Sequence, residues 1–159
     1  MTLTFQKIYE TWSALQNESS EKINIIMKLM IENDQKLTFG DDYKRLEEGK
    51  DVEKTSELYN LSPFMEDGIV KMQTRLTYSE ILPEQMKHPV ILAKDSRLAT
   101  LVIMDAHVTQ LHAGPEQTKR KVRNHFWTIG GKRSISKVIK SCLHKECTSR
   151  RMKLVLQPP

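Results

Sequence analysis

Apolar residues recur at three- and four-residue steps through the first third of the chain. The first series consists of Phe5, Ile8, Tyr9, Trp12 and Leu15. The second series consists of Ile23, Ile26, Met27, Met30 and Ile31. This spacing predicts two amphipathic helices, separated near Gln16–Glu21, where Ser19 or Ser20 is suited to cap the second helix. The two methionines of the second helix are expected in a core or against a partner.

The middle of the chain predicts a small amount of β structure. Residues 38–60 are polar and rich in turn-forming residues, which is typical of a linker with some helix. Asp67-Gly68 lies between short apolar runs, and this dipeptide predicts a tight β-hairpin. Residues 89–93 form a further short apolar strand that begins at a proline. So few strands do not form a stable sheet alone, so we expect them to pack against helices.

Three helices are predicted in the last third of the chain. Asp95 or Ser96 is suited to cap a helix that runs through Leu98 toward Leu111, where residues 112–115 (HAGP) end it. Pro115 is suited to the first position of the second helix. That helix places three residues on one face: Thr118, Val122 and Phe126. The third helix carries an apolar stripe at i, i+3, i+4 and i+7: Ile135, Val138, Ile139 and Cys142.

We therefore predict a mostly α chain with a small β element. Residues 1–57 form a helical and linker segment, and residues 58–93 form a hairpin and strand region. Residues 94–150 form a three-helix domain, and residues 151–159 form a tail. A chain of 159 residues has room for one ordinary domain or two small ones.

The charge is distributed unevenly along the chain. Residues 1–114 contain 13 Lys and Arg against 18 Asp and Glu, a balance of −5, whereas residues 115–159 contain 12 against 2, a balance of +10. A surface dominated by positive charge attracts polyanions, so the carboxy-terminal third is a candidate nucleic-acid surface. The alternative is an ordinary solvated helix face.

The sequence also gives expectations about compartment. It has no run of 18 apolar residues, and its first residues lack the pattern of a signal peptide. We expect an intracellular protein, in the cytoplasm or the nucleus, with no membrane partner. In a reducing compartment its two cysteines are more typical of thiols or metal ligands than of a disulfide.

Both cysteines and four of the five histidines lie between residues 105 and 151. His107 and His112 are five residues apart, so a continuous helix would separate them by about 140° of rotation. A helix that ends before Gly114-Pro115 lets His112 turn back toward His107. With Cys142 and Cys147, these residues would supply the two nitrogens and two sulfurs of a closed structural zinc site. The alternative is two surface histidines and two ordinary thiols.

A catalytic zinc site is not indicated. The chain contains no His-Glu-x-x-His sequence, and no carboxylate stands out as a general base beside an open metal position.

Residues 87–142 resemble the His-His-Cys-Cys zinc-binding domain of the integrase in BEL/Pao-type retrotransposon Pol polyproteins. The resemblance lies in His-x4-His-x-Gly at residues 107–114, Phe126-Trp127, the turn at residues 131–133 and Val138-Ile139 followed by Cys142. Residues 56–76 and 82–92 are similar to the segment that precedes this domain in the same polyproteins. The resemblance thus extends over about residues 40–159.

The resemblance implies a structural Zn²⁺ held by His107, His112, Cys142 and Cys147. In the family the second cysteine usually follows the first after two residues, where this chain has Lys145. Cys147 lies two residues further on, and His144 is the reserve ligand.

The resemblance also implies a function. It suggests a non-catalytic module for DNA integration, as a fragment or domesticated copy of an integrase, because the acidic catalytic core expected after the proline-rich end does not follow. The implied partners are DNA and other integrase subunits or a second copy, with no small-molecule substrate. The candidate phosphate contacts are Lys119, Arg120, Arg123, Lys132, Arg133, Lys137 and Lys140. The alternatives are a zinc-stabilised protein–protein interaction module without DNA binding, or an incomplete polynucleotidyl transferase.

Overall fold

The computed structural model describes residues 20–78, 80–81, 83–143 and 147. Its helices are α2 (Ser20–Glu47), α3 (Glu84–Lys87), α4 (Arg97–Thr109), α5 (Pro115–Val122) and α6 (Gly131–Lys140), with short 3₁₀ turns at Tyr59–Leu61 and Arg75–Tyr78. Its strands are β1 (Pro63–Glu66), β2 (Ile69–Met72), β3 (Val90–Leu92) and β4 (Phe126–Thr128). The expected helix-rich fold with a small β element is confirmed. The helix predicted from Phe5 to Leu15, its junction at Ser19 and the tail lie outside the described residues.

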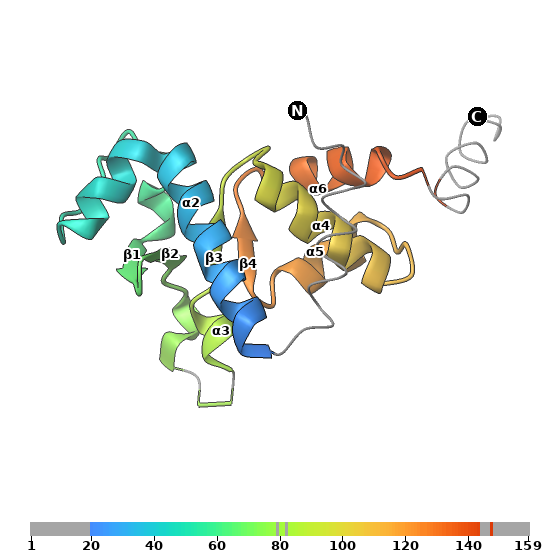
Figure 1. The fold of residues 1–159 in the computed structure, drawn as a ribbon, viewed down its shortest axis with the longest axis horizontal. Coiled ribbons are helices and arrows are strands. Elements are labelled where there is room, and N and C mark those ends of the chain that lie inside the picture. Colours follow the sequence, from blue (N-terminus) through green and yellow to red (C-terminus); the bar gives the residue numbers. More distant parts are fainter. Residues whose placement is uncertain (1–19, 79, 82, 144–146, 148–159) are drawn as a thin grey trace.

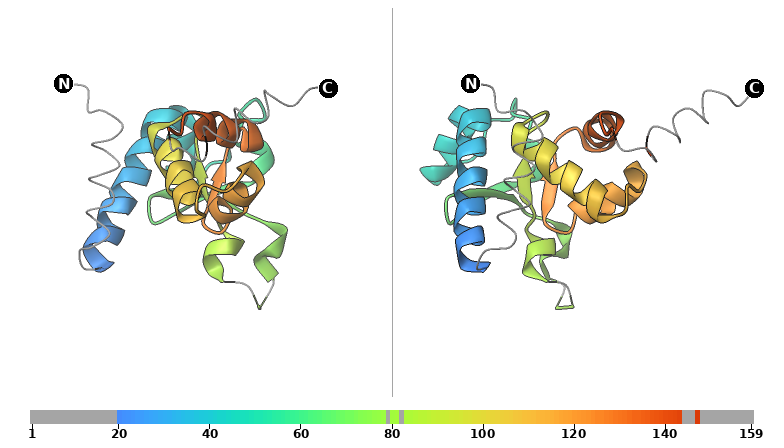
Figure 2. Two further views of the ribbon diagram at one scale, coloured as in Figure 1. Left: turned by 90° about the vertical axis from the view of Figure 1, so that its right-hand side faces the viewer. Right: turned by 45° about the vertical axis from the view of Figure 1, so that its right-hand side comes forward.

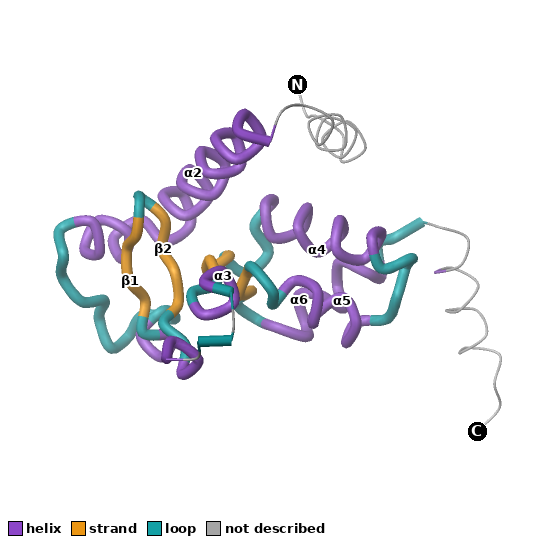
Figure 3. The backbone as a smooth tube through the Cα atoms, turned by 90° about the horizontal axis from the view of Figure 1, so that it is seen from below, coloured by secondary structure: helices purple, strands orange, loops and turns teal. Residues whose placement is uncertain are grey.

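The strands form one sheet in the order β1-β2-β3-β4. The β1–β2 and β2–β3 pairs are antiparallel, whereas β3 and β4 are parallel. The hairpin predicted at Asp67-Gly68 is confirmed, because Glu66 pairs with Ile69 across that turn. The strand predicted at residues 89–93 is confirmed as β3. The helix α2 and the hairpin lie toward one end of the molecule, and α4, α5 and α6 lie together toward the other (Figure 1, Figure 3).

The prediction that Phe126 continues the face of the second helix is wrong. The helix α5 ends at Val122, and Phe126 begins β4. The three residues of β4 pair in parallel with β3, and the Val90 N–H donates to the carbonyl of His125 at 3.0 Å. Aromatic and β-branched residues favour a strand once a partner strand is present. The zinc-binding segment therefore contains a strand between its second and third helices.

Residues 38–60, expected to be a linker with some helix, take part in a hydrophobic core. The helix α2 continues to Glu47 past a break in its backbone at Gly40 (φ 37°, ψ −97°). Beyond the break lie four buried residues of one apolar cluster: Tyr43, Leu46, Val52 and Leu58. They pack with Val70 and Met72 of β2 and Ile91 of β3. Because these apolar residues are irregularly spaced, a search for helical or strand periodicity does not detect the cluster.

A second core cluster joins α2 to the carboxy-terminal helices. Ile31 of α2 is buried together with residues of β3, α4, α5 and α6: Leu92, Leu98, Ala99, Val102, Ile103, Ala106, Val122 and Ile135. The right-hand view shows α2 on one side of the strands and α5 and α6 farther across the molecule (Figure 2), while α4 contacts α2. The three carboxy-terminal helices are thus packed on elements that precede them in the chain.

A fully buried glutamine of α2 forms hydrogen bonds with the backbone of the sheet. Gln35 Nε2 donates to the carbonyl oxygens of Val70, at 2.9 Å, and Ile91, at 2.8 Å. Its Oε1 accepts from the Val70 N–H at 2.8 Å. β2 and β3 share one register pair, Lys71 with Val90. Gln35 therefore satisfies backbone groups at the place where the ladder between these strands is short.

We predict that Gln35→Ala destabilises the protein by about 3 kcal/mol, because it leaves one N–H and two carbonyl groups buried without their partner. Urea unfolding followed by circular dichroism measures this change. Asn33→Ala, at an exposed position of the same helix, is the matched control and should stay within about 0.5 kcal/mol of wild type. Equal effects of the two substitutions would contradict the role given to Gln35.

Candidate metal centre

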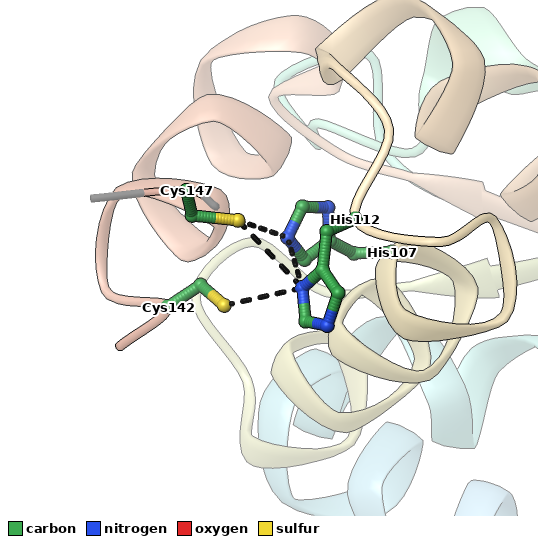
Figure 4. Close-up of side chains that lie close together, drawn as sticks. All are labelled: His107, His112, Cys142 and Cys147. Carbon is green, nitrogen blue, oxygen red and sulfur yellow. Dashed lines mark hydrogen bonds between the residues drawn. The ribbon is translucent and has the colours of Figure 1, made fainter. Parts of the chain in front are cut away.

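Four side chains from two parts of the chain converge at the carboxy-terminal ends of α4 and α6. His107 lies in the last turn of α4, and His112 follows that helix. Cys142 comes directly after the C-cap of α6, and Cys147 lies five residues further on. In the close-up the two imidazoles and two thiols point toward one another (Figure 4). The structure thus brings together the four residues that the sequence predicts as ligands.

The helix α4 is positioned at its start by the predicted cap. Ser96 has extended backbone angles, and its hydroxyl accepts from the Ala99 N–H at 3.0 Å. Of the two cap candidates, Ser96 is therefore the N-cap. The buried face of α4 then runs to His107, whose exposed fraction is 0%.

The end of α4 explains how His112 reaches His107. The His112 N–H donates to the His107 carbonyl at 2.9 Å, and the Leu111 N–H donates to the Val108 carbonyl at 2.9 Å. This pair of hydrogen bonds is the Schellman motif, which places the second residue after the helix cap over the third residue from the helix end. Those two positions are His112 and His107. The turn that ends the helix therefore also brings the two imidazoles together.

The left-handed position of this motif is occupied by leucine rather than glycine. Leu111 has φ 51° and His112 has φ 57°, although residues with a Cβ rarely adopt such values. The Leu111 side chain is 82% exposed, so burial of that side chain contributes little to holding the turn. The two backbone hydrogen bonds and the contacts of the neighbouring His112 side chain hold the turn in place.

Four of the six distances between the ligand atoms are close to those around a tetrahedral zinc ion. Zn–N bonds of about 2.05 Å and Zn–S bonds of about 2.3 Å imply N–N separations of about 3.3 Å and N–S separations of about 3.6 Å. His112 Nδ1 lies 3.3 Å from His107 Nε2, and His107 Nε2 lies 3.3 Å from Cys147 Sγ. His112 Nδ1 lies 3.5 Å from Cys142 Sγ and 3.6 Å from Cys147 Sγ. All four atoms lie within 4.8 Å of one another.

The surroundings of His107 set its tautomer. Its Nδ1 lies 2.9 Å from the carbonyl oxygen of Ala113. A carbonyl only accepts, so Nδ1 carries the proton and Nε2 presents its lone pair to the ligand cluster. A backbone carbonyl on the far nitrogen is the usual support of a metal-binding histidine. The predicted structural Zn²⁺ is therefore confirmed as a fit to these four residues.

Four protein donors leave a tetrahedral ion no position for water, and this is the arrangement of a structural zinc site. The sequence prediction names Cys147 as the fourth ligand and His144 as its reserve. The structure places Cys147 Sγ among the ligand atoms, whereas His144 lies outside the described residues. Lys145, which occupies the usual cysteine position, also lies outside them.

The predicted nucleic-acid contacts lie on α5, α6 and the ends of these helices. Within residues 115–143 there are eight Lys and Arg and a single acidic residue, Glu116. Glu116 pairs with Lys132 at 3.0 Å and with Lys119 at 3.8 Å. The hydrogen bond from Lys132, followed by the charge of Lys119, lowers the pKa of the Glu116 carboxyl. One carboxylate therefore partly offsets these two cations, and the charge of Arg120 also lowers the pKa of Glu116 to a smaller extent.

The other candidate cations differ in their partners. Lys137 pairs with Asp95 at 2.8 Å, and this hydrogen bond lowers the pKa of Asp95. The Arg123 guanidinium lies 4.7 Å from the centroid of the Trp127 ring. Arg120 and Arg133 are exposed, and no carboxylate of the described part of the chain forms an ion pair with either. Lys140 is also exposed.

The fold and the four-ligand centre define a small zinc-stabilised helical module. Residues 94–151 match the family model described as the integrase zinc binding domain, a range that includes all four ligands. No curated protein and no solved structure shows a significant match to the chain. In the described ranges, no helix is long and apolar enough to cross a membrane.

We predict that Cys147→Ser removes the bound zinc and unfolds the helices at the metal centre, because zinc binding contributes directly to the folding free energy of such a module. Metal content after gel filtration and the helical circular dichroism signal measure the two effects. His144→Ala is the matched control and should retain stoichiometric zinc. Zinc loss in the His144 variant with retention in the Cys147 variant would show that His144 is the fourth ligand.

We further predict that Leu111→Gly stabilises the zinc-bound protein by up to about 1 kcal/mol. Glycine relieves the strain of a left-handed position, which outweighs the greater freedom it gives to the unfolded chain. Thermal unfolding at fixed zinc concentration measures this gain. Leu111→Ala keeps the Cβ and should show no gain, so equal stabilisation by both would refute the strain at this turn.

Proposed function

We propose that this protein is a non-catalytic module of a retroelement integrase of the BEL/Pao type, which engages nucleic acid and partner subunits. The observation that carries the proposal is the four-ligand zinc geometry within the segment that matches the integrase zinc binding domain. All four donors come from the protein, so the ion has a structural role. The similarity of the hairpin and of β3 to the segment that precedes this domain supports the BEL/Pao assignment.

The basic side chains of α5 and α6 support the engagement of nucleic acid. The helices α5 and α6 pack against each other, so the cations of both helices belong to one zinc-stabilised unit. Among the candidate contacts, Arg120 and Arg133 are best suited to phosphates because neither is committed to a carboxylate of the described chain. Lys132 and Lys137 already form ion pairs, so they contribute less to the attraction. Phosphate contacts position nucleic acid without selecting a base sequence.

A protein–protein interaction module without nucleic-acid binding is the competing function. Two apolar side chains next to metal ligands favour it, since Leu111 is 82% and Leu143 is 88% exposed. Dependence on salt separates the two functions, because phosphate contacts release counterions and apolar contacts do not.

We predict that the protein binds a DNA duplex with an affinity that falls steeply as salt rises, and that Arg120→Gln and Arg133→Gln each reduce the slope of log K against log salt by about one. Fluorescence anisotropy at several salt concentrations measures the slope. Lys54→Gln removes the same charge from an exposed site after α2 and should leave the slope unchanged. A flat salt response in the wild-type protein would favour the interaction module instead.

A further inference from the structure

A small cavity lies where α5, β4 and the start of α6 meet. Its volume is about 130 Å³. Pockets for drug-sized ligands measure roughly 300–1,000 Å³, so this cavity is suited to a single small group. Its lining includes two cations, a hydroxyl, an indole and two glycines, and it contains no carboxylate: Lys119, Arg123, Thr128, Trp127, Gly130 and Gly131. The cavity therefore offers hydrogen-bond donors and positive charge.

The hydroxyl of Thr128 is a buried polar group that faces this cavity. Phe126 packs in the core cluster of Val122 and Ile135, whereas Trp127 packs in the other main cluster. Side chains alternate along a strand, so Thr128 faces the same side as Phe126, where Val122 and Ile135 line the cavity. Thr128 is 8% exposed, and its hydroxyl has no hydrogen-bond partner among the described residues. Buried hydroxyls are nearly always hydrogen-bonded, so this one indicates a ligand in the cavity.

The start of α6 adds backbone donors to the cavity. The helix has ten residues, and its N-cap Gly130 has no side chain that could accept from the N–H groups of the first turn. These N–H groups lack acceptors within the helix and carry the positive end of its dipole. A Cβ added at Gly131 would meet no atom within 4 Å, so the space beside this backbone is open. The start of α6 can therefore hold an anion.

The two cations of the cavity are only weakly committed to other groups. The Arg123 guanidinium lies 4.7 Å from the centroid of the Trp127 ring. Arg123 forms no ion pair with a carboxylate of the described ranges. Lys119 lies 3.8 Å from Glu116, which forms a closer ion pair with Lys132 at 3.0 Å. Arg123 and Lys119 are therefore available to neutralise an anion in the cavity.

We infer that the cavity between α5, β4 and α6 binds one phosphate group. The Arg123 and Lys119 side chains neutralise its charge, while the Thr128 hydroxyl and the first N–H groups of α6 donate to its oxygen atoms. The phosphate belongs either to a nucleic-acid backbone or to a free phosphate ion, and binding experiments distinguish these sources. Only the first source rests on the proposed function.

Titration with inorganic phosphate at constant ionic strength tests the cavity itself. The amide NMR signals of Gly131 and Lys132 should shift and saturate. Thr128→Val keeps the shape of the side chain and should raise the Kd for phosphate about tenfold, because a hydrogen bond to a charged group is lost. Thr100→Val is the matched control, since its hydroxyl donates to the Ser96 carbonyl at 3.0 Å and does not line the cavity. It should leave the Kd unchanged.

Zinc content and circular dichroism should be the same in both threonine variants and in the wild-type protein. A titration without saturable shifts, or equal changes of the Kd in the two variants, would overturn the inference.

A second pair of variants separates the cavity from the general positive charge of α5. Arg123→Gln should weaken the binding of inorganic phosphate, because it removes a cation that lines the cavity. Lys121→Gln removes the same charge from an exposed position of the same helix outside the cavity, and it should leave the Kd unchanged. Equal weakening by both substitutions would indicate diffuse attraction and would overturn the inference.

Binding of a DNA duplex identifies the source of the phosphate. If the phosphate belongs to the DNA backbone, Thr128→Val should lower the affinity for DNA by a similar factor at every salt concentration. The slope of log K against log salt should not change, because a hydroxyl releases no counterion. An effect of Thr128→Val on inorganic phosphate without any effect on DNA would support the cavity and assign it to free phosphate.

The inference and the proposed function fail separately in these experiments. Saturable binding of phosphate that depends on Thr128, in a protein that does not bind DNA, would support the inference and contradict the proposed function. Salt-dependent binding of DNA without any saturable binding of phosphate would overturn the inference and leave the proposed function in place.

Discussion

The zinc-binding segment depends on the backbone turn that ends α4. Its backbone hydrogen bonds place His112 over His107, so local structure brings together half of the ligand set. The other half comes from the end of α6, at least 30 residues away. Near the centre the apolar cluster is small, and two of its three buried members are the cysteines themselves. The metal therefore joins two helix ends that burial alone holds weakly.

The remaining part of the segment is held by elements outside it. β4 pairs in parallel with β3. A hydrogen bond from Gln35 connects β3 to α2. Ile31 of α2 lies in the same core as Val122 of α5 and Ile135 of α6. One end of the helical module is thus fixed by zinc, and the other is fixed by a sheet and a long helix. This arrangement keeps α5 and α6 in position while their cations remain at the surface.

Local chemistry allowed much of this structure to be predicted from the sequence. Asp67-Gly68 predicts its hairpin, Ser96 caps α4 and Pro115 begins α5. Contacts between distant residues were harder to predict. Phe126 continues a helical pattern, and its place in β4 depends on a strand more than 30 residues earlier. Without knowledge of the sheet, Gln35 cannot be distinguished from any other polar residue of a helix. The left-handed conformation of Leu111 is not indicated by its residue type, because leucine rarely adopts it.

The zinc centre and the surface cations contribute differently to the charge of the module. Two thiolates and two neutral imidazoles balance the two positive charges of a zinc ion, so an occupied centre adds no net charge to the module. The positive field around α5 and α6 therefore comes from side chains, with Glu116 as the single acidic residue of that stretch. Because the ion is enclosed and its site is neutral, salt acts mainly on the surface and little on the metal centre. Salt can consequently weaken the proposed binding of a polyanion without changing the stability of the fold.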